Sequence, residues 1–179
     1  MRYIWGVDGA FDSTGISIFD LDTFKHLNTF NIVTSPEQGN DGFRLRYLRL
    51  EIERLKEQYP PFEVAIEGSF NHPTRYQANK DVFMALGATK DALFEYTPIS
   101  YQPKTVKLVA GGHGDSTKAR MKRAVLINDE SALFGSVDDM YDSYCVAVTH
   151  LVKKYGMKWI VPDDDKGLKK KKPKKKNTE

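Results

Sequence analysis

Four carboxylates in three separate segments of this sequence could together bind divalent metal ions. Asp8 follows the apolar run YIWGV, and Glu67 follows the apolar run VAI. Asp139 and Asp142 precede apolar residues at helical spacing, so they share one helix face, where their charges repel unless a cation lies between them. Carboxylate oxygens are the ligands that magnesium prefers. Two such ions about 4 Å apart can hydrolyse a phosphodiester, because one activates water and the other stabilises the leaving oxygen.

Each of these acids alone also has an ordinary structural explanation. A carboxylate at a strand end can simply be solvated, and an acid in the first turn of a helix complements the helix dipole or caps the helix. The combination of two strand ends with the pair on the helix favours a metal site, since open α/β sheets place their sites at strand ends. Asp138 is an alternative to Asp139 within this set.

Strands and helices alternate along the part of the chain that carries these residues. We expect strands at 2–8, 14–20, 26–33, 62–68 and 98–103, helices at 42–59, 73–96 and about 139–154, and a helix, a glycine-rich loop and a helix over 103–128. A short apolar stretch follows at 158–162. Three strands followed by alternating helices and strands predict an α/β fold, with one mixed sheet and helices on its faces.

Length and composition indicate one globular domain. The 179 residues are 40% hydrophobic, which is enough for a substantial core. The single cysteine, Cys145, excludes a disulfide within the chain and a zinc site built from cysteines. No signal peptide or membrane-spanning run is apparent, so we expect a soluble protein in the cytoplasm with no membrane partner.

The positive charge is concentrated at one end of the sequence. Residues 166–179 contain eight lysines and one glutamate, a net charge of +7, whereas residues 1–165 carry 19 basic and 23 acidic residues, a net charge of −4. We therefore expect one folded domain at 1–162 and a disordered, lysine-rich C-terminal tail at 163–179. The tail either aids solubility or localisation, or attracts nucleic-acid phosphates without sequence preference.

Four segments, in order, resemble the RuvC-type Holliday-junction resolvases of the RNase H-like superfamily. They are WGVDGAFDSTGISIFD, VAIEGSF, PKTVKLVAGGHGDSTK and DDMYDSYCVAVTH. The resemblance runs from about residue 1 to about residue 155. It implies an RNase H-like mixed β-sheet flanked by α-helices. It also implies a homodimer that resolves four-way DNA junctions by metal-dependent nicking.

The resemblance also assigns roles by position. The metal ligands and catalytic residues would be Asp8, Glu67, Asp139 and Asp142, and the DNA-binding residues would be Phe70, Lys107 and Lys118. The cofactor would be Mg²⁺, with Mn²⁺ as a substitute and two ions per site. The lysines could instead be ordinary surface residues, and the phenylalanine could belong to the core. Part of the dimer interface would lie on the helix expected at 73–96, on Val82, Phe83, Leu86 and Leu93, unless this face packs only on its own sheet.

Departures from the family pattern leave alternatives open. Gly9-Ala10 stands where the family usually has proline-glycine, and the lysine-rich tail lies outside the pattern, which suggests a divergent, phage-encoded member with broader specificity.

Another RNase H-like nuclease, acting on flaps, other branched DNA or hybrids, is the nearest alternative. GVDGAFDSTG also resembles the phosphate loop of actin-like and sugar-kinase ATP-binding proteins, but those need two lobes. The negative charge of residues 1–165 argues against a non-catalytic DNA-binding module. His113 and His150 are not assigned to the site.

Overall fold

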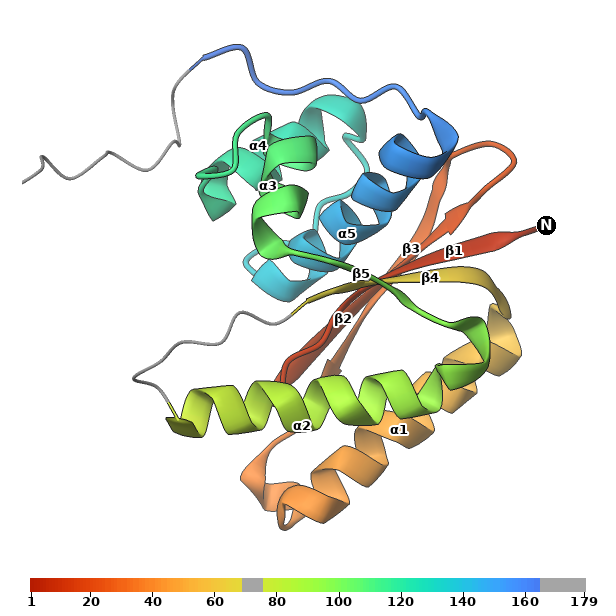
Figure 1. Ribbon diagram of the computed structural model, residues 1–179, viewed down its shortest axis with the longest axis vertical. Coiled ribbons are helices and arrows are strands. Elements are labelled where there is room, and N and C mark those ends of the chain that lie inside the picture. The colour runs from red at the N-terminus through yellow and green to blue at the C-terminus, as the bar shows by residue number, and fades with distance from the viewer. Residues whose placement is uncertain (69–75, 165–179) are drawn as a thin grey trace, which may run out of the picture.

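A five-stranded sheet lies between two groups of helices in the computed structural model, which describes residues 1–68 and 76–164 (Figure 1). The strands are β1 (Tyr3–Asp8), β2 (Ser13–Asp20), β3 (His26–Val33), β4 (Pro61–Glu67) and β5 (Ile99–Tyr101). The helices are α1 (Asp41–Gln58), α2 (Tyr76–Ala92), α3 (Pro103–Gly111), α4 (Lys118–Asn128) and α5 (Asp138–Tyr155), with short 3₁₀ turns η1 (Pro36–Gln38) and η2 (Phe94–Tyr96). The expected α/β class is confirmed.

The sheet is mixed, in the strand order β3-β2-β1-β4-β5. β1, β2 and β3 form an antiparallel meander, whereas β4 is parallel to β1 and β5 is parallel to β4. Because β1 and β4 are parallel neighbours, their carboxyl ends lie at the same edge of the sheet. Asp8 and Glu67 are the last residues of these two strands.

Alternation along the strands separates two hydrophobic cores. Trp5 and Val7 on β1 pack in the core that contains α1 and α2, whereas Ile4 packs in the core formed with α3, α4 and α5. Successive side chains of a strand point to opposite faces. Asp8 is therefore in phase with Ile4 and points to the α5 face of the sheet.

Two expected elements differ from the structure. The helix expected at 73–96 ends at Ala92 and is followed by η2; residues 73–75 lie outside the described part. Thr97 adopts a left-handed backbone conformation (φ 47°), and it precedes Pro98, which disfavours helical geometry in the residue before it. The apolar stretch at 158–162 forms no strand and crosses the helices as irregular chain. Among the described helices, none has the length and apolar character needed to cross a membrane.

Candidate metal centre

The four predicted carboxylates meet at one edge of the sheet. Asp8 and Glu67 end adjacent parallel strands, and the Glu67 carboxylate is close enough to raise the pKa of Asp8. The first turns of α5 add Asp139 and Asp142. One carboxylate oxygen from each of Asp8, Asp139 and Asp142 lies within 4.8 Å of the others. All four residues line one cavity of about 290 Å³.

Two glycines allow α5 to lie directly on the sheet. Gly15 is the β2 partner of Asp8, and a Cβ atom added to it would lie 2.1 Å from the carbonyl oxygen of Asp139. A Cβ atom added to Gly6 would lie 2.3 Å from the carbonyl oxygen of Ser143. Both distances are far below van der Waals contact, so only glycine fits. The sequence reasoning missed these residues, although a glycine inside a buried strand is a recognised signal of close backbone approach.

We predict that Gly15→Ala destabilises the protein, because the added methyl group must displace the first turn of α5. Overpacking of this kind costs about 1–3 kcal/mol. For a chain of this size each kcal/mol lowers the melting temperature by about 2–4 °C. Gly87→Ala on α2 is the matched control, since its added Cβ meets nothing within 4 Å; alanine there is expected to stabilise the helix by about 0.5–1 kcal/mol. Equal melting temperatures for the two variants would contradict the close-packing account.

Two lysines extend from neighbouring helices into the same cavity. Lys107 on α3 lines its wall, and Lys118 is the first residue of α4. The Lys118 Nζ atom lies 3.2 Å from Asp142 Oδ2 and 3.2 Å from Asp138 Oδ2. Both lysines singled out in the sequence therefore lie beside the carboxylates.

Asp138 has a different role from its neighbour in the chain. Its carboxylate forms ion pairs with Lys118 and with Lys122, whose Nζ atom lies 2.8 Å from Asp138 Oδ1. Asp139 instead groups with Asp8 and Asp142. The geometry thus favours Asp139 over Asp138 as the fourth member of the cluster. Lys122, which follows Lys118 by one helical turn, was not identified from the sequence.

Burial and mutual repulsion hold the carboxyl groups at raised pKa values. Burial raises the pKa of Asp8 well above its usual range, and the charges of Glu67, Asp142 and Asp139 raise it further. Burial, followed by Asp142, raises the pKa of Glu67 to about 7. Burial also raises the pKa of Asp142, although Lys118 partly offsets this effect. For Lys118, burial opposes the charge, but the neighbouring carboxylates outweigh burial and raise the pKa of the ammonium group.

This donor set fits hard divalent cations. Its members are carboxylate oxygens, and they project from two strand ends and one helix. Burial is the largest cause of the raised pKa values, the neighbouring acids add to it, and the lysines offset it only in part. A bound divalent cation would favour the ionised carboxylates, and oxygen ligands of this kind are the ones that such ions take.

The other residues considered from the sequence lie away from this cluster or outside the described part. Phe70 falls in 69–75, which the structure does not describe. His113 is in the loop between α3 and α4, where its Nδ1 atom accepts from the backbone N–H of Asp115. His150 is buried between Glu63 and the hydroxyl of Tyr101. Neither histidine lines the carboxylate cavity.

A buried arginine supports the loop that follows Asp8. The Arg44 guanidinium ion-pairs with Asp12, donates from Nε to Thr34 Oγ1 at 3.1 Å, and stacks 4.1 Å from the ring centre of Phe11. These contacts fix residues 11 and 12 against α1, three to four positions after Asp8. The sequence contains a signal for this role, because Arg44 lies four residues before Leu48, on the buried side of the helix.

Comparisons with known proteins identify relatives over most of the chain. No protein-family model matches it. The crossover junction endodeoxyribonuclease RuvC of Xanthomonas oryzae pv. oryzae (strain MAFF 311018) is 31% identical over 157 residues, covering 84% of this chain and 87% of the relative. RuvC of Xylella fastidiosa (strain 9a5c) is 28% identical over 161 residues, covering 84% and 88%.

A solved structure agrees with these sequence relatives. T. thermophilus RuvC in complex with Holliday junction substrate superimposes with a TM-score of 0.72 at 22% identity, covering 84% of this chain and 93% of that one. At this identity the match shows a shared fold. The fold, the order of the motifs and a relative 31% identical over most of both chains lead to one assignment. This chain belongs to the RuvC family of crossover junction endodeoxyribonucleases.

Proposed function

We propose that this protein is a metal-dependent endonuclease that resolves four-way (Holliday) DNA junctions by paired phosphodiester hydrolysis. The observation that carries the proposal is the convergence of Asp8, Glu67, Asp139 and Asp142 in one cavity with two lysines. The curated relatives are named crossover junction endodeoxyribonucleases, and a structural neighbour was solved with a Holliday junction substrate. The chain would act on DNA in the cytoplasm of a bacterial or phage-infected cell.

The four carboxylates would hold Mg²⁺, or Mn²⁺ in its place, with two ions per site. When bound, such ions supply activated water and stabilise the leaving oxygen of the phosphodiester. Asp8 and Glu67 are fixed by the sheet and Asp142 by α5, so the ligand oxygens are positioned before DNA arrives. Because the pKa of Glu67 is raised to about 7, protons compete with metal for this carboxylate, and activity should rise with pH through this range.

Lys107 and Lys118 would hold the DNA phosphate beside the metal ligands. Their ammonium groups are the cations of the cavity wall. Lys118 pairs with Asp142 and Asp138, so it can exchange one of these carboxylates for a phosphate oxygen without leaving the site. Phe70 stays a candidate for stacking on an unpaired base, which is worth about 1–3 kcal/mol where it occurs.

A homodimer follows from the symmetry of the proposed substrate. A four-way junction is nearly two-fold symmetric, and its resolution requires two matched nicks, so one site per chain implies two chains with an isologous interface. Of the α2 residues expected there, Leu93 is fully buried within its own chain and is unavailable. Val82 and Leu86 line a small cavity together with Asp8 and Glu67. Phe83, with 47% of its surface exposed, is the α2 residue that we propose for the interface.

Phe83→Glu is therefore expected to convert the protein to a monomer and to reduce junction resolution to isolated single nicks. A buried charge at the centre of an apolar contact is strongly unfavourable. Sedimentation velocity at micromolar concentration would report the change. Phe94→Glu is the matched control, because Phe94 is 73% exposed but lies in η2, outside the α2 surface. If Phe83→Glu and Phe94→Glu sediment alike, the α2 interface is wrong.

A panel of DNA substrates tests the proposed activity. The full chain with Mg²⁺ is incubated with a synthetic four-way junction, a flap, an RNA–DNA hybrid and linear duplex of matched sequence. The proposal predicts efficient nicking of the junction and little of the linear duplex. Preferential cleavage of the flap or hybrid would identify another RNase H-like nuclease instead. Tight ATP binding without any cleavage would favour the ATP-binding alternative.

A further inference from the structure

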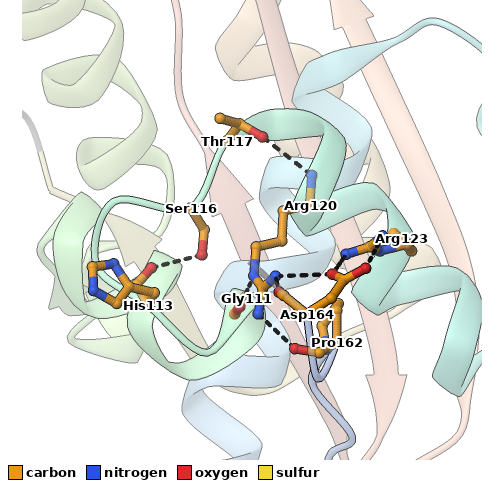
Figure 2. A network of polar contacts seen from close by, with 8 residues as sticks. All are labelled: Gly111, His113, Ser116, Thr117, Arg120, Arg123, Pro162 and Asp164. Carbon is orange, nitrogen blue, oxygen red and sulfur yellow. Dashed lines mark hydrogen bonds and ion pairs between the residues drawn. The ribbon is translucent and has the colours of Figure 1, made fainter. Parts of the chain in front are cut away.

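Helix α4 is anchored on the face that points away from the carboxylate cavity. The guanidinium of Arg120, which is buried, donates to three backbone carbonyl oxygens, those of Gly111, Pro162 and Asp164 (Figure 2). Arg120 is two positions after Lys118, which is about 200° of rotation around the helix axis. The first turns of α4 are therefore held from behind, while Lys118 faces α5.

On the α5 side, two lysines of α4 alternate with two aspartates of α5. In order they are Lys122, Asp138, Lys118 and Asp142, called here the charge ladder. The Lys122 Nζ atom lies 2.8 Å from Asp138 Oδ1, and the Lys118 Nζ atom lies 3.2 Å from Asp138 Oδ2. Lys118 Nζ also lies 3.2 Å from Asp142 Oδ2. Each oxygen of the Asp138 carboxylate thus holds one lysine, and the ladder ends on a member of the metal-ligand cluster.

Exposure separates the roles of the two lysines. The Lys118 side chain is 55% exposed and lines the carboxylate cavity. The Lys122 side chain is only 27% exposed, and its Nζ atom lies 4.9 Å from the ring centre of Tyr141, which is buried. Lys122 is also outside the set of residues that line the cavity. Lys118 is therefore the rung that a DNA phosphate can reach, whereas Lys122 is placed to act on Asp138.

We infer that Lys122 and Asp138 are positioning residues, which hold the Lys118 ammonium group beside the metal ligands for a DNA phosphate. This inference rests on the proposed function. Lys118 has two carboxylate partners, and one of them, Asp142, is a proposed metal ligand. Asp138 lies outside the ligand cluster, so it can keep Lys118 in place while Asp142 serves as a ligand. Lys122 fixes Asp138 and balances its charge, so the charge of Lys118 remains for the phosphate.

Each ion pair alone also has a purely local explanation. An acid in the first turn of α5 complements the helix dipole, and an exposed ion pair contributes little to stability. Local explanations predict that substitutions at Lys122 and Asp138 act independently of Lys118. The positioning role predicts instead that their effects on the reaction disappear when Lys118 is absent, because they act through it.

A mutant cycle distinguishes these explanations. At saturating protein, Lys122→Gln should lower the single-turnover rate of junction nicking by about three- to tenfold, a loss similar to that of Asp138→Asn. The protein concentration that gives half of the maximal rate should change by less than about twofold. In a Lys118→Gln background, neither substitution should lower the rate further by more than about twofold. Lys122→Arg, which keeps a cation for Asp138 and for the ring of Tyr141, should restore the rate of the parent.

Lys56→Gln is the matched control for the loss of an ion-paired lysine. The Lys56 Nζ atom, on α1, lies 2.8 Å from Glu53 Oε2 and 2.8 Å from Glu95 Oε1. Its removal should lower the melting temperature without changing the nicking rate, because this cluster lies outside the cavity. A change in rate that merely follows stability would appear in this control as well.

A second readout needs neither DNA nor metal. It is the side-chain ¹⁵N resonance of Lys118, identified by its absence from the spectrum of Lys118→Gln. This resonance should shift towards those of exposed lysines in Lys122→Gln and Asp138→Asn, and stay in place in Lys122→Arg and Lys56→Gln.

Two results would overturn the inference. One is an unchanged nicking rate together with an unchanged Lys118 resonance in a folded Lys122→Gln protein. The other is a loss of rate from Lys122→Gln that is equally large in the Lys118→Gln background, because Lys122 would then act on DNA or on the fold by itself. Absence of nicking by the unmodified chain would overturn the proposed function instead, and the Lys118 resonance would still test the charge ladder.

Discussion

Asp8→Asn is expected to abolish nicking of a four-way junction without unfolding the protein. The Asp8 carboxylate lies within 4.8 Å of those of Asp139 and Asp142, so a neutral amide there removes one of the proposed metal ligands. A loss of more than about 10³-fold in rate is expected, the upper end for removing one preorganised electrostatic group. Because burial and the neighbouring acids oppose the Asp8 charge, the metal-free variant should be at least as stable as the parent. Single-turnover cleavage and thermal melting of the same samples measure both effects.

Asp138→Asn is the matched control for this experiment. Asp138 adjoins the cluster in sequence but pairs with Lys118 and Lys122. Its loss should change the cleavage rate by about tenfold or less, the low end for a residue that acts through a neighbour. Asp139→Asn should behave like Asp8→Asn. Normal cleavage by Asp139→Asn, together with an inactive Asp138→Asn protein, would reverse the assignment of the fourth ligand.

Magnesium should stabilise the protein, and more strongly at pH 8 than at pH 5. The folded pKa values of Asp8, Glu67 and Asp142 are raised, so between about pH 4.5 and 7 the folded state holds more protons than the unfolded state. The stability of the metal-free protein therefore falls as pH rises through this window. Metal requires the ionised carboxylates, so it should restore stability where they are deprotonated.

The size of this effect can be stated for a saturating metal concentration. At one hundred times the dissociation constant, binding to the folded state alone adds about 2.7 kcal/mol. For a chain of this size the melting temperature should rise by about 5–10 °C at pH 8, with a smaller rise at pH 5, where Glu67 is protonated. Asp8→Asn should lose most of the rise. An equal rise at both pH values, or in the Asp8→Asn protein, would place metal binding elsewhere.

Strand periodicity and motif spacing were enough to predict the parts of the molecule that depend on local sequence. The apolar runs before Asp8 and Glu67 defined two strands, and the three-residue interval between Asp139 and Asp142 defined a shared helix face. Their convergence could be expected because open α/β sheets place their sites at strand ends, whereas the parallel pairing of β1 with β4 became known only from the structure. The mixed α/β architecture followed from the order of the elements.

Features that depend on contacts between distant segments could not be predicted in the same way. Gly15 matters because the backbone of Asp139 lies against it, and the two residues are 124 positions apart in the sequence. Likewise, Arg120 looks in the sequence like one more basic residue of an exposed helix, because the carbonyl groups of Pro162 and Asp164 that cover it lie 42 and 44 positions later in the chain. Leu93 was expected at an interface because it shares an apolar helix face with Val82 and Leu86. In the structure Leu93 is buried in the core between the sheet and α2, against which Leu86 also packs, so at this position the face packs on its own sheet.

The most direct test of the account is to map the nicks in a synthetic four-way junction with each of its four strands end-labelled in turn. With Mg²⁺ present, the account predicts nicks in two opposed strands at symmetry-related positions near the branch point, and none when the ion is chelated. Nicks in a single strand, in all four strands alike, or at equal rates with the ion chelated would contradict it.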